Sequence, residues 1–212
     1  MTLKPIQSFK KPGNVRFGVY EQKGFSLITT LILLVVTTIL GVGAAQMVLQ
    51  AEKSTRYERD SQIAFQAAEA ALLDAEFDIR GPNTSGLSRT STFVTGSVVG
   101  FVDGCGTGTQ RGLCTPSLAS QKPVWYGVDF QDETSGAKTA KFGEFTGRTL
   151  STGTSGIRPE LLPRYIIEVI PDPTPGSSAN ASTQPTLYRV TAMGFGPRKS
   201  TQAAAQMIFR KE

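Results

Sequence analysis

The sequence predicts an α+β protein in which one long N-terminal helix packs on an antiparallel β-sheet. Two observations predict this fold class. An uncharged apolar stretch, residues 25–49, runs directly into residues 50–80, which contain many strong helix formers and no Gly or Pro. Residues 81–212 contain instead several short β-prone runs separated by Gly, Pro and Ser. A chain of 212 residues has room for one ordinary domain and an additional segment.

The composition argues against several classes of function. The chain has no His, which excludes His-based general-base catalysis and His-ligated metals. The net charge is +5, but residues 1–24 hold five basic residues and one acidic residue, so the remainder is close to neutral. A nucleic-acid surface needs clustered Lys and Arg on the folded body. We therefore predict no enzymatic activity, no cofactor and no primary nucleic-acid-binding role.

Residues 25–49 form the predicted transmembrane segment. They carry no charge and are long enough to span a bilayer. The basic residues precede this segment, so the positive-inside rule places the N-terminus in the cytoplasm and the bulk of the chain outside it. Three fates fit such a sequence: an uncleaved signal anchor, a signal peptide cut near residues 42–44, or cleavage before the apolar segment.

Residues 50–80 are predicted to continue the helix as an amphipathic segment. Gly81 and Pro82 supply the stop, because Gly adopts the left-handed cap and Pro cannot continue the helical ladder. A continuous helix over residues 25–80 would be roughly 84 Å long. Apolar residues at spacings of three and four predict a face that packs on the protein's own domain. This face consists of Phe65, Ala68, Leu72, Ala75 and Ile79.

Residues 81–212 are predicted to form the β-rich body. Alternation of side chains is clearest in residues 164–170 and 187–192. The prolines within residues 171–186 predict a loop, and residues 194–200 predict the turn before the last strand. Residues 146–157 predict another surface loop and suggest no chemistry. The predicted strands are residues 92–102, 124–130, 164–170, 187–194 and 203–209.

The two cysteines, Cys105 and Cys114, are predicted to form a disulfide. Their body lies outside the cytoplasm in this interpretation, where thiols oxidise, and the Gly-rich segment between them can fold back. Two cysteines without His make a poor zinc site. The adjacent acids Asp132 and Glu133 are a weak calcium candidate, because such pairs in polar loops are usually solvated. We predict no metal site.

The boundary between the basic and apolar segments, Lys23-Gly24-Phe25, resembles the processing site of type IV prepilins. In that family a prepilin peptidase cuts after the Gly, and the new N-terminal residue is N-methylated. The resemblance implies a cytoplasmic leader over residues 1–24, a cut between Gly24 and Phe25, and a type IV pilin-like fold. Most prepilins carry Glu at the fifth mature position, where this chain has Thr29. That departure is typical of subunits that cap filaments and points away from a major pilin.

Further strings narrow the resemblance to the PilX-type minor pilins. Residues 64–76, AFQAAEAALLDAE, resemble the helix of that subgroup. The GLC string at 112–114, followed by Pro123 and Trp125, resembles its body, as do PRYIIE at 163–168 and LYRVTAMGFG at 187–196. Residues 131–160 and the Pro-rich loop have no counterpart in the resemblance.

The resemblance implies a structural subunit that primes type IV pilus assembly within a tip complex. Its partners would be other minor pilins, the major pilin, the inner-membrane assembly platform and a PilY-type tip adhesin. It would reside in the inner membrane with residues 81–212 in the periplasm, and later at the pilus tip on the cell surface. Two alternatives remain open at this point: a minor pseudopilin of type II secretion, or a membrane-anchored periplasmic domain with an adhesive or binding role.

Overall fold

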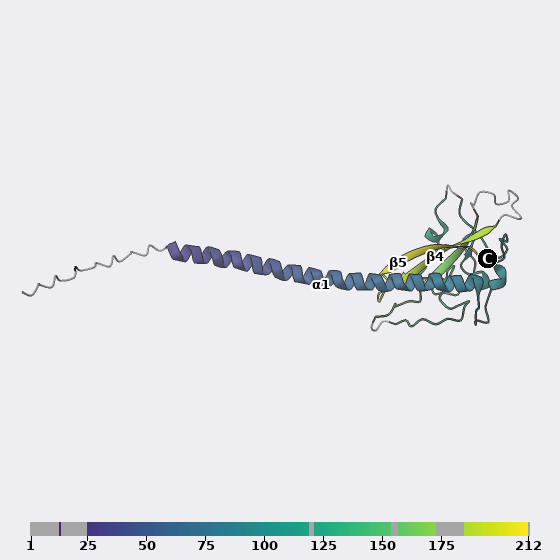
Figure 1. Cartoon of the computed structure of the whole chain (residues 1–212), viewed down its shortest axis with the longest axis horizontal. Helices are drawn as coiled ribbons and strands as arrows, with labels where there is room; N and C mark the ends of the chain where they lie inside the picture. Colours follow the sequence, from purple (N-terminus) through teal and green to yellow (C-terminus); the bar gives the residue numbers. More distant parts are fainter. Residues whose placement is uncertain (1–12, 14–24, 119–120, 154–156, 173–184, 212) are drawn as a thin grey trace, which may run out of the picture. The chain divides into compact units, whose positions relative to one another are not determined.

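The computed structural model describes residue 13 and residues 25–118, 121–153, 157–172 and 185–211. One helix, α1 (Phe25–Arg80), contains both the apolar and the amphipathic stretch (Figure 1). It ends as the sequence predicts, because Gly81 adopts a φ of 73° while its N–H donates to the carbonyl of Phe77. The chain divides into two compact units, Met1–Ala51 and Glu52–Glu212, and α1 contributes to both.

The sheet belongs to the second unit and is built around one antiparallel meander. Its strands follow the order β1-β3-β4-β5, and β2 pairs with β3 beside β1. β4 and β5 form a hairpin with a short loop, because the Gly196 N–H donates to the carbonyl of Thr201, only five residues later, at 2.8 Å. β1 is parallel to β3, so the sheet is mixed at one edge and antiparallel elsewhere. The strands are β1 (Leu113–Cys114), β2 (Ala140–Lys141), β3 (Arg164–Pro171), β4 (Thr186–Phe195) and β5 (Gln202–Phe209).

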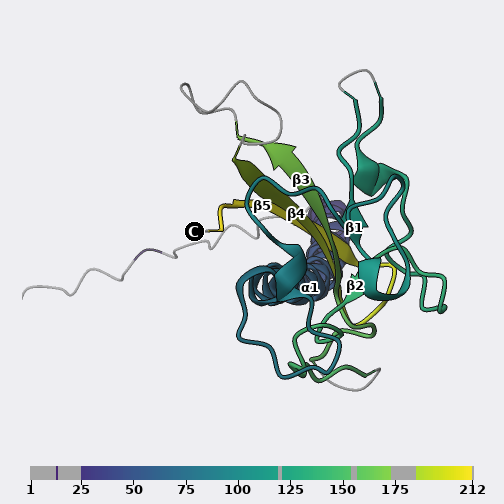
Figure 2. The ribbon, with the colours of Figure 1, turned by 90° about the vertical axis from the view of Figure 1, so that its right-hand side faces the viewer.

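The main core lies between α1 and one face of the sheet, an arrangement that Figure 2 shows nearly along the helix axis. Alternate residues of β3 and β4 point toward the helix, because successive strand side chains face opposite sides. Phe93 closes the core from a loop, with its ring edge-to-face against Tyr188 at a centroid distance of 5.4 Å. The buried members of this core from the helix and the two long strands are Ala71, Ala75, Ile79, Tyr165, Ile167, Val169, Tyr188, Val190 and Ala192.

The opposite face of β3 is also covered. Ile166 packs there with Phe130, Phe195 and the two cysteines. Burial on both faces explains why the sequence of β3 is a nearly continuous apolar run, with little alternation of apolar and polar residues. Glu168 is completely buried on this strand, and it pairs with Arg189, which lies directly opposite on β4.

Two predicted strands are wrong. Residues 92–102 are not a strand: a 3-10 turn at Thr90–Thr92 leads into bends in which Gly96 and Gly100 adopt positive φ angles, which interrupt extended pairing. Residues 124–130 contain the 3-10 turn Val124–Tyr126 in place of a strand. Both runs are rich in β-branched or aromatic residues, yet of these two described runs only Val102 pairs with the sheet, through an isolated bridge to Cys114. The remaining predicted strands are confirmed as β3, β4 and β5.

Candidate functional site

The first half of α1 carries a surface suited to lipid or to neighbouring apolar helices. Every Leu, Ile, Val and Met side chain from Leu27 to Leu49 is exposed. The helix is long and apolar enough to cross a membrane, with a mean hydropathy of 2.4 in its most apolar window. An apolar surface of this extent is unfavourable in water and favourable in hydrocarbon. Of the predicted processing residues, Lys23 and Gly24 lie outside the described residues, and Phe25 is the first residue of α1.

The threonines of this segment bond back onto the helix. The hydroxyl of Thr29 donates to the Ser26 carbonyl at 2.9 Å. Thr30, Thr37 and Thr38 likewise donate to carbonyls three or four residues earlier. Such bonds satisfy each hydroxyl within the helix, so that polar residues are tolerated in an apolar environment. Thr29 is therefore a neutral residue whose hydroxyl is hydrogen-bonded within its own helix.

The second half of α1 is held against the sheet by small side chains. Ala64, Ala68 and Ala75 are buried, and Ile79 has no exposed surface. The approach is closest at Gly194 of β4, where an added Cβ would overlap the backbone of Ala64 and Ala68. Any larger residue at these positions would separate the helix from the strand.

One member of the predicted packing face is wrong. Phe65 leaves 49 % of its surface exposed, and Leu72 is only partly buried at the margin of the core. The centre of the buried face is rotated toward Ala64 and Ala71, which are completely buried. The sequence pattern favoured the larger apolar side chains, whereas the close contact with the strand requires the smaller ones.

A buried ionic cluster joins α1 to the disulfide loop. Asp78 accepts hydrogen bonds from Arg89 through both carboxylate oxygens and from the Tyr165 hydroxyl at 3.0 Å. The remaining Arg89 nitrogen, Nη1, donates to the carbonyls of Thr109 and Arg111 at 2.9 and 2.6 Å. The guanidinium also lies over the Phe145 ring, with its Cζ 3.5 Å from the ring centroid. Every charged group of the cluster is thereby compensated, as burial requires.

The environment of this cluster shifts the acidity of its tyrosine. Burial raises the pKa of Tyr165 well above its ordinary value, and the neighbouring Asp78 carboxylate acts in the same direction. Tyr165 is therefore a neutral hydrogen-bond donor at physiological pH. Its role is to orient the Asp78 carboxylate toward Arg89.

A second buried carboxylate, Asp74, lies one helical turn before Asp78. It accepts hydrogen bonds from the Thr146 hydroxyl and from the Gly143 N–H, the latter at 2.8 Å. Burial raises the pKa of the Asp74 carboxyl above its ordinary value, although these two hydrogen bonds oppose the shift. The carboxylate fastens the turn at residues 143–147 to the helix.

These buried charges were not found from the sequence. The available signal was the spacing of Asp74 and Asp78, which lie four residues apart among alanines on an otherwise apolar face. Their partners carry no sequence signal of their own: Arg89 lies in the loop that follows α1, and Thr146 lies in a loop distant in sequence.

The disulfide between Cys105 and Cys114 is present, as the sequence predicts, with a Cα–Cα distance of 4.2 Å. Both cysteines are almost completely buried, and Cys114 ends the short strand β1 that lies beside β3. Within the loop that they close, Arg111 extends to Glu144 at 2.6 Å and to the carbonyls of Ala137 and Ser135. The disulfide thus fixes the sheet-covering loop that also receives Arg89.

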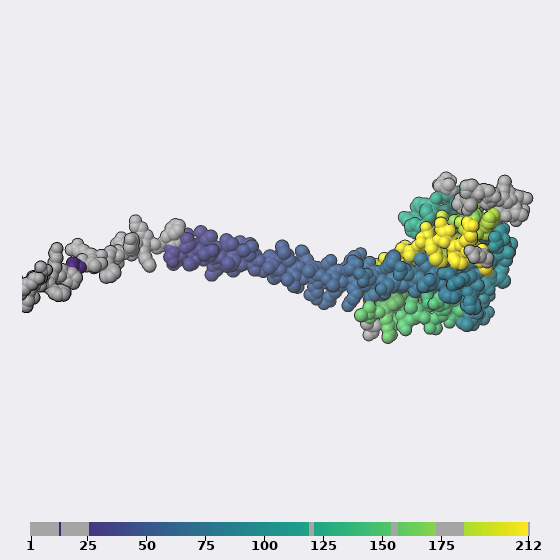
Figure 3. All heavy atoms as spheres, in the orientation of Figure 1, coloured from purple at the N-terminus to yellow at the C-terminus, as the bar shows by residue number. Residues whose placement is uncertain are grey.

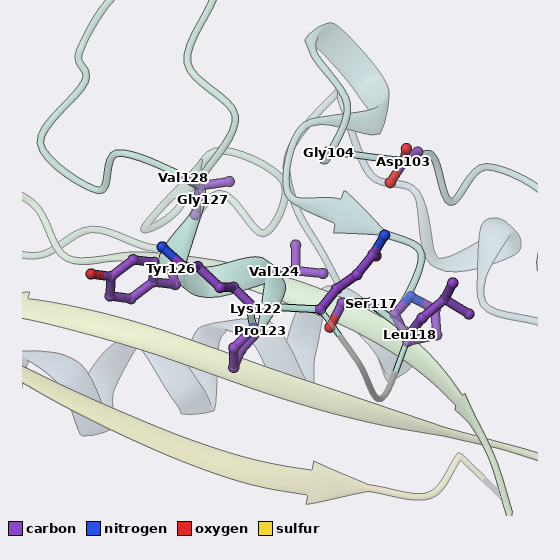
Figure 4. Close-up of a pocket in the computed structure, with 12 residues that line it drawn as sticks. Asp103, Gly104, Ser117, Leu118, Lys122, Pro123, Val124, Tyr126, Gly127 and Val128 are labelled. Atoms are coloured by element: carbon purple, nitrogen blue, oxygen red, sulfur yellow. The ribbon is translucent and has the colours of Figure 1, made fainter.

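A cavity of about 430 Å³ opens beside this loop, and Figure 4 shows its lining residues. Asp103 approaches it from the segment before Cys105, while Lys122 and Tyr126 come from the segment around the 3-10 turn. The Lys122 ammonium lies 4.9 Å from the centroid of the Tyr126 ring. No group of three or more Cys, Asp or Glu suited to a metal ion occurs within the part of the chain that the structure describes. None of the predicted site residues lines this cavity.

Comparison with known families gives two matches, which together cover most of the chain. Residues 23–73 match the family model described as PilX N-terminal. Residues 103–211 match the family model described as type IV pilus assembly protein PilX C-term. No curated protein and no solved structure matches the chain significantly. The first match begins at the predicted processing site, and the second contains the disulfide and every strand of the sheet.

Proposed function

Because this chain belongs to the PilX family and is a minor pilin that takes part in type IV pilus assembly, we propose that it acts in a complex at the pilus tip. In this proposal α1 anchors the subunit in the inner membrane, with its N-terminus in the cytoplasm and the body in the periplasm. Extraction of α1 into the growing pilus then carries the body to the cell surface. The observation that carries the proposal is the neutral Thr29 in the first turns of an exposed apolar helix.

The first step of the proposed pathway is processing between Gly24 and Phe25. A prepilin peptidase would remove residues 1–24 as the leader and leave Phe25 as the N-methylated first residue. Support comes from two observations: the exposed apolar surface of α1 directly follows the predicted cut, and the family match begins at residue 23.

The neutral group at Thr29 favours an end position in the filament. In a filament of prepilin-type subunits, the fifth-position carboxylate would neutralise the N-terminal amine of a neighbouring subunit inside an apolar bundle. An unpaired ammonium in such surroundings is costly. The Thr29 hydroxyl bonds to Ser26 in its own helix and carries no charge for that amine. A subunit of this kind is better placed where one neighbour is absent.

The partners in this proposal are the other minor pilins and the major pilin, reached through α1, together with the inner-membrane platform. A PilY-type tip adhesin would contact the body. The exposed apolar half of α1 supports helix-to-helix contacts with other pilins, because such a surface packs equally well on lipid or on apolar helices.

The processing step is tested by the intact mass and the N-terminal residue of the membrane-fraction protein. Strains with and without the prepilin peptidase are compared. We expect a chain that begins at methylated Phe25, and we expect it only when the peptidase is present. A chain that begins near Ala45, or an uncut chain in both strains, would overturn the proposal.

The end position is tested by immunogold labelling of pili. We expect label at filament ends for the natural chain and along the shaft for Thr29→Glu, which supplies the missing carboxylate. Thr30→Glu is the matched control, because it adds the same charge one residue away and should not enter the shaft. Labelling of the shaft by the natural chain would contradict a role confined to the tip.

A further inference from the structure

The outer edge of β5 (Gln202–Phe209) is an open pairing edge. β5 is last in the strand order, and β4 is its partner among the described strands. The bond from the Gly196 N–H to the Thr201 carbonyl marks the first hydrogen-bonded pair of the hairpin, and such pairs alternate along an antiparallel ladder. The register therefore directs one set of N–H and C=O groups away from β4. These groups belong to Gln202, Ala204, Gln206 and Ile208.

β5 lacks the usual features that prevent an edge strand from pairing. Its sequence, QAAAQMIF, contains no charge, no Pro and no Gly over eight residues. Edge strands that stay unpaired are commonly short, charged, bulged or covered. Here every second residue is exposed, the alternate residues are only half-buried, and Ile208 leaves 64 % of its surface exposed. Figure 3 shows the yellow C-terminal segment at the molecular surface next to α1.

One end of this edge meets a basic cavity of about 380 Å³. The cavity is lined by Arg80 at the end of α1, by Phe209 at the end of β5, and by Arg210 and Lys211, which follow that strand. The Lys211 ammonium donates to the backbone carbonyl of Thr90 at 3.1 Å. Arg210 forms an ion pair with Asp172 but leaves 57 % of its side chain exposed. Arg80 likewise pairs with Glu76 at 3.0 Å and leaves 51 % of its side chain exposed. An incoming strand would therefore end beside partly exposed cationic groups, which can contact a further carboxylate.

The charges disfavour a second copy of this chain as the occupant. Arg198 and Lys199 precede β5, and Arg210 and Lys211 follow it, so both ends of the strand are basic. Antiparallel self-pairing would bring the two basic ends of different copies together, and parallel self-pairing would align each end with itself. Like charges in such positions oppose association.

We propose that the outer edge of β5 binds an extended segment of another protein whose strand-forming residues are uncharged and whose end carries an acidic residue, which lies beside Arg80 and Lys211. The added strand would accept and donate the outward main-chain hydrogen bonds of β5, and its acidic residue would give the interaction its orientation. Pairing would also cover the half-exposed Met207 and Phe209, which already pack against the core. The inference rests on the proposed function only for the source of the partner, which would be another component of the pilus.

The test uses the full-length chain in detergent and synthetic peptides of alternating Thr and Val. One peptide carries Asp at both ends and a second carries Lys at both ends. We expect the Asp peptide to bind more tightly than the Lys peptide, with a difference that shrinks as salt is added. Hydrogen exchange should show new protection of the Ala204, Gln206 and Ile208 amides on binding, because these N–H groups point to the open edge.

Ala204→Pro is the diagnostic variant. It removes one outward N–H without removing a bond to β4, and we expect the affinity for the Asp peptide to fall about tenfold. Ala204→Thr keeps the N–H at the same position and is the matched control, with affinity expected to stay close to that of the natural chain. The exchange measurement on the natural chain decides the question if the proline variant fails to fold.

Several results would overturn this inference. These are unchanged exchange of the three amides, equal binding of the Asp and Lys peptides, or equal binding by Ala204→Pro and Ala204→Thr. A dimer in sedimentation that Ala204→Pro abolishes would assign the edge to a second copy of this chain. Failure of peptide binding would leave the processing test untouched, so the two proposals fail separately.

Discussion

Asp78 on α1 and Arg89 in the following loop form a buried bidentate ion pair, with Nη2 of the arginine 2.6 Å from Oδ2 of the carboxylate. Arg89 Nε lies 3.1 Å from both carboxylate oxygens. Because Arg89 also bonds to two carbonyls of the disulfide loop, this pair connects the helix to that loop. Together with the contacts of Asp74, it supplies the buried polar contacts between the second half of α1 and the body.

Removing one partner of this pair should be strongly destabilising. In Asp78→Asn the amide keeps the volume of the side chain but leaves the buried Arg89 charge uncompensated, and we expect a loss of about 3–5 kcal/mol in the free energy of unfolding. Urea unfolding of the full-length chain in detergent, followed by near-UV circular dichroism, measures this loss. Glu52→Gln is the control, since the Glu52–Arg56 pair is exposed and its loss should cost less than about 1 kcal/mol. Equal effects of the two substitutions would contradict the assigned role.

The buried Asp74 should make stability depend on pH in a defined direction. Its folded-state pKa is raised by burial, so the fold favours the protonated form, and the stability that this group contributes is lost as pH rises through the folded pKa. Asp74→Asn stays neutral at every pH and has no such loss. We therefore expect the free energy of unfolding of Asp74→Asn, relative to the natural chain, to fall as pH decreases from about 7 to about 4. A constant difference across this range would show that burial does not raise the pKa.

The disulfide should contribute measurable stability to the loop that Arg89 and Arg111 hold. For a loop of this size the chain-entropy model gives about 2–3 kcal/mol, which should be lost in the double variant Cys105→Ser with Cys114→Ser. Chemical unfolding with and without reductant measures the loss. Reductant should destabilise the natural chain and leave the double variant unchanged; an effect on both would indicate some other cause.

Gly194 should be the least tolerant position of the interface between helix and sheet. An added methyl group would overlap the backbone of Ala64 and Ala68, so Gly194→Ala should lower the free energy of unfolding by about 1–3 kcal/mol. Gly86→Ala is the matched control, because a Cβ there has open space around it. Comparable unfolding midpoints for the two variants would show that α1 can move away from β4 without a loss in the free energy of unfolding.

Periodicity and turn chemistry were sufficient to predict the helix and the three long strands. α1 ends at Arg80 because Gly81 and Pro82 stop a helix in any fold, and β3 to β5 follow runs whose composition favours extended backbone. β1 and β2 are two residues each and were not predicted. Strands of that length exist only because β3 offers them an edge, which is a property of the assembled sheet.

The features of the candidate site also divide into those that the sequence predicts and those that only the tertiary structure decides. The family resemblance, the apolar segment and the cysteine pair are properties of neighbouring residues, so the sequence by itself determined the long apolar helix and the disulfide. It also supplied the processing boundary, which stays a prediction. The tertiary structure alone decided which helix face is buried and which charges are compensated. At Gly194 the strand lies so close to α1 that alanines, and not Phe65, occupy the buried face of the helix. Arg89 contacts Asp78 only after the chain has folded back. Contact distance and burial arise between segments far apart in sequence, and no local pattern encodes them.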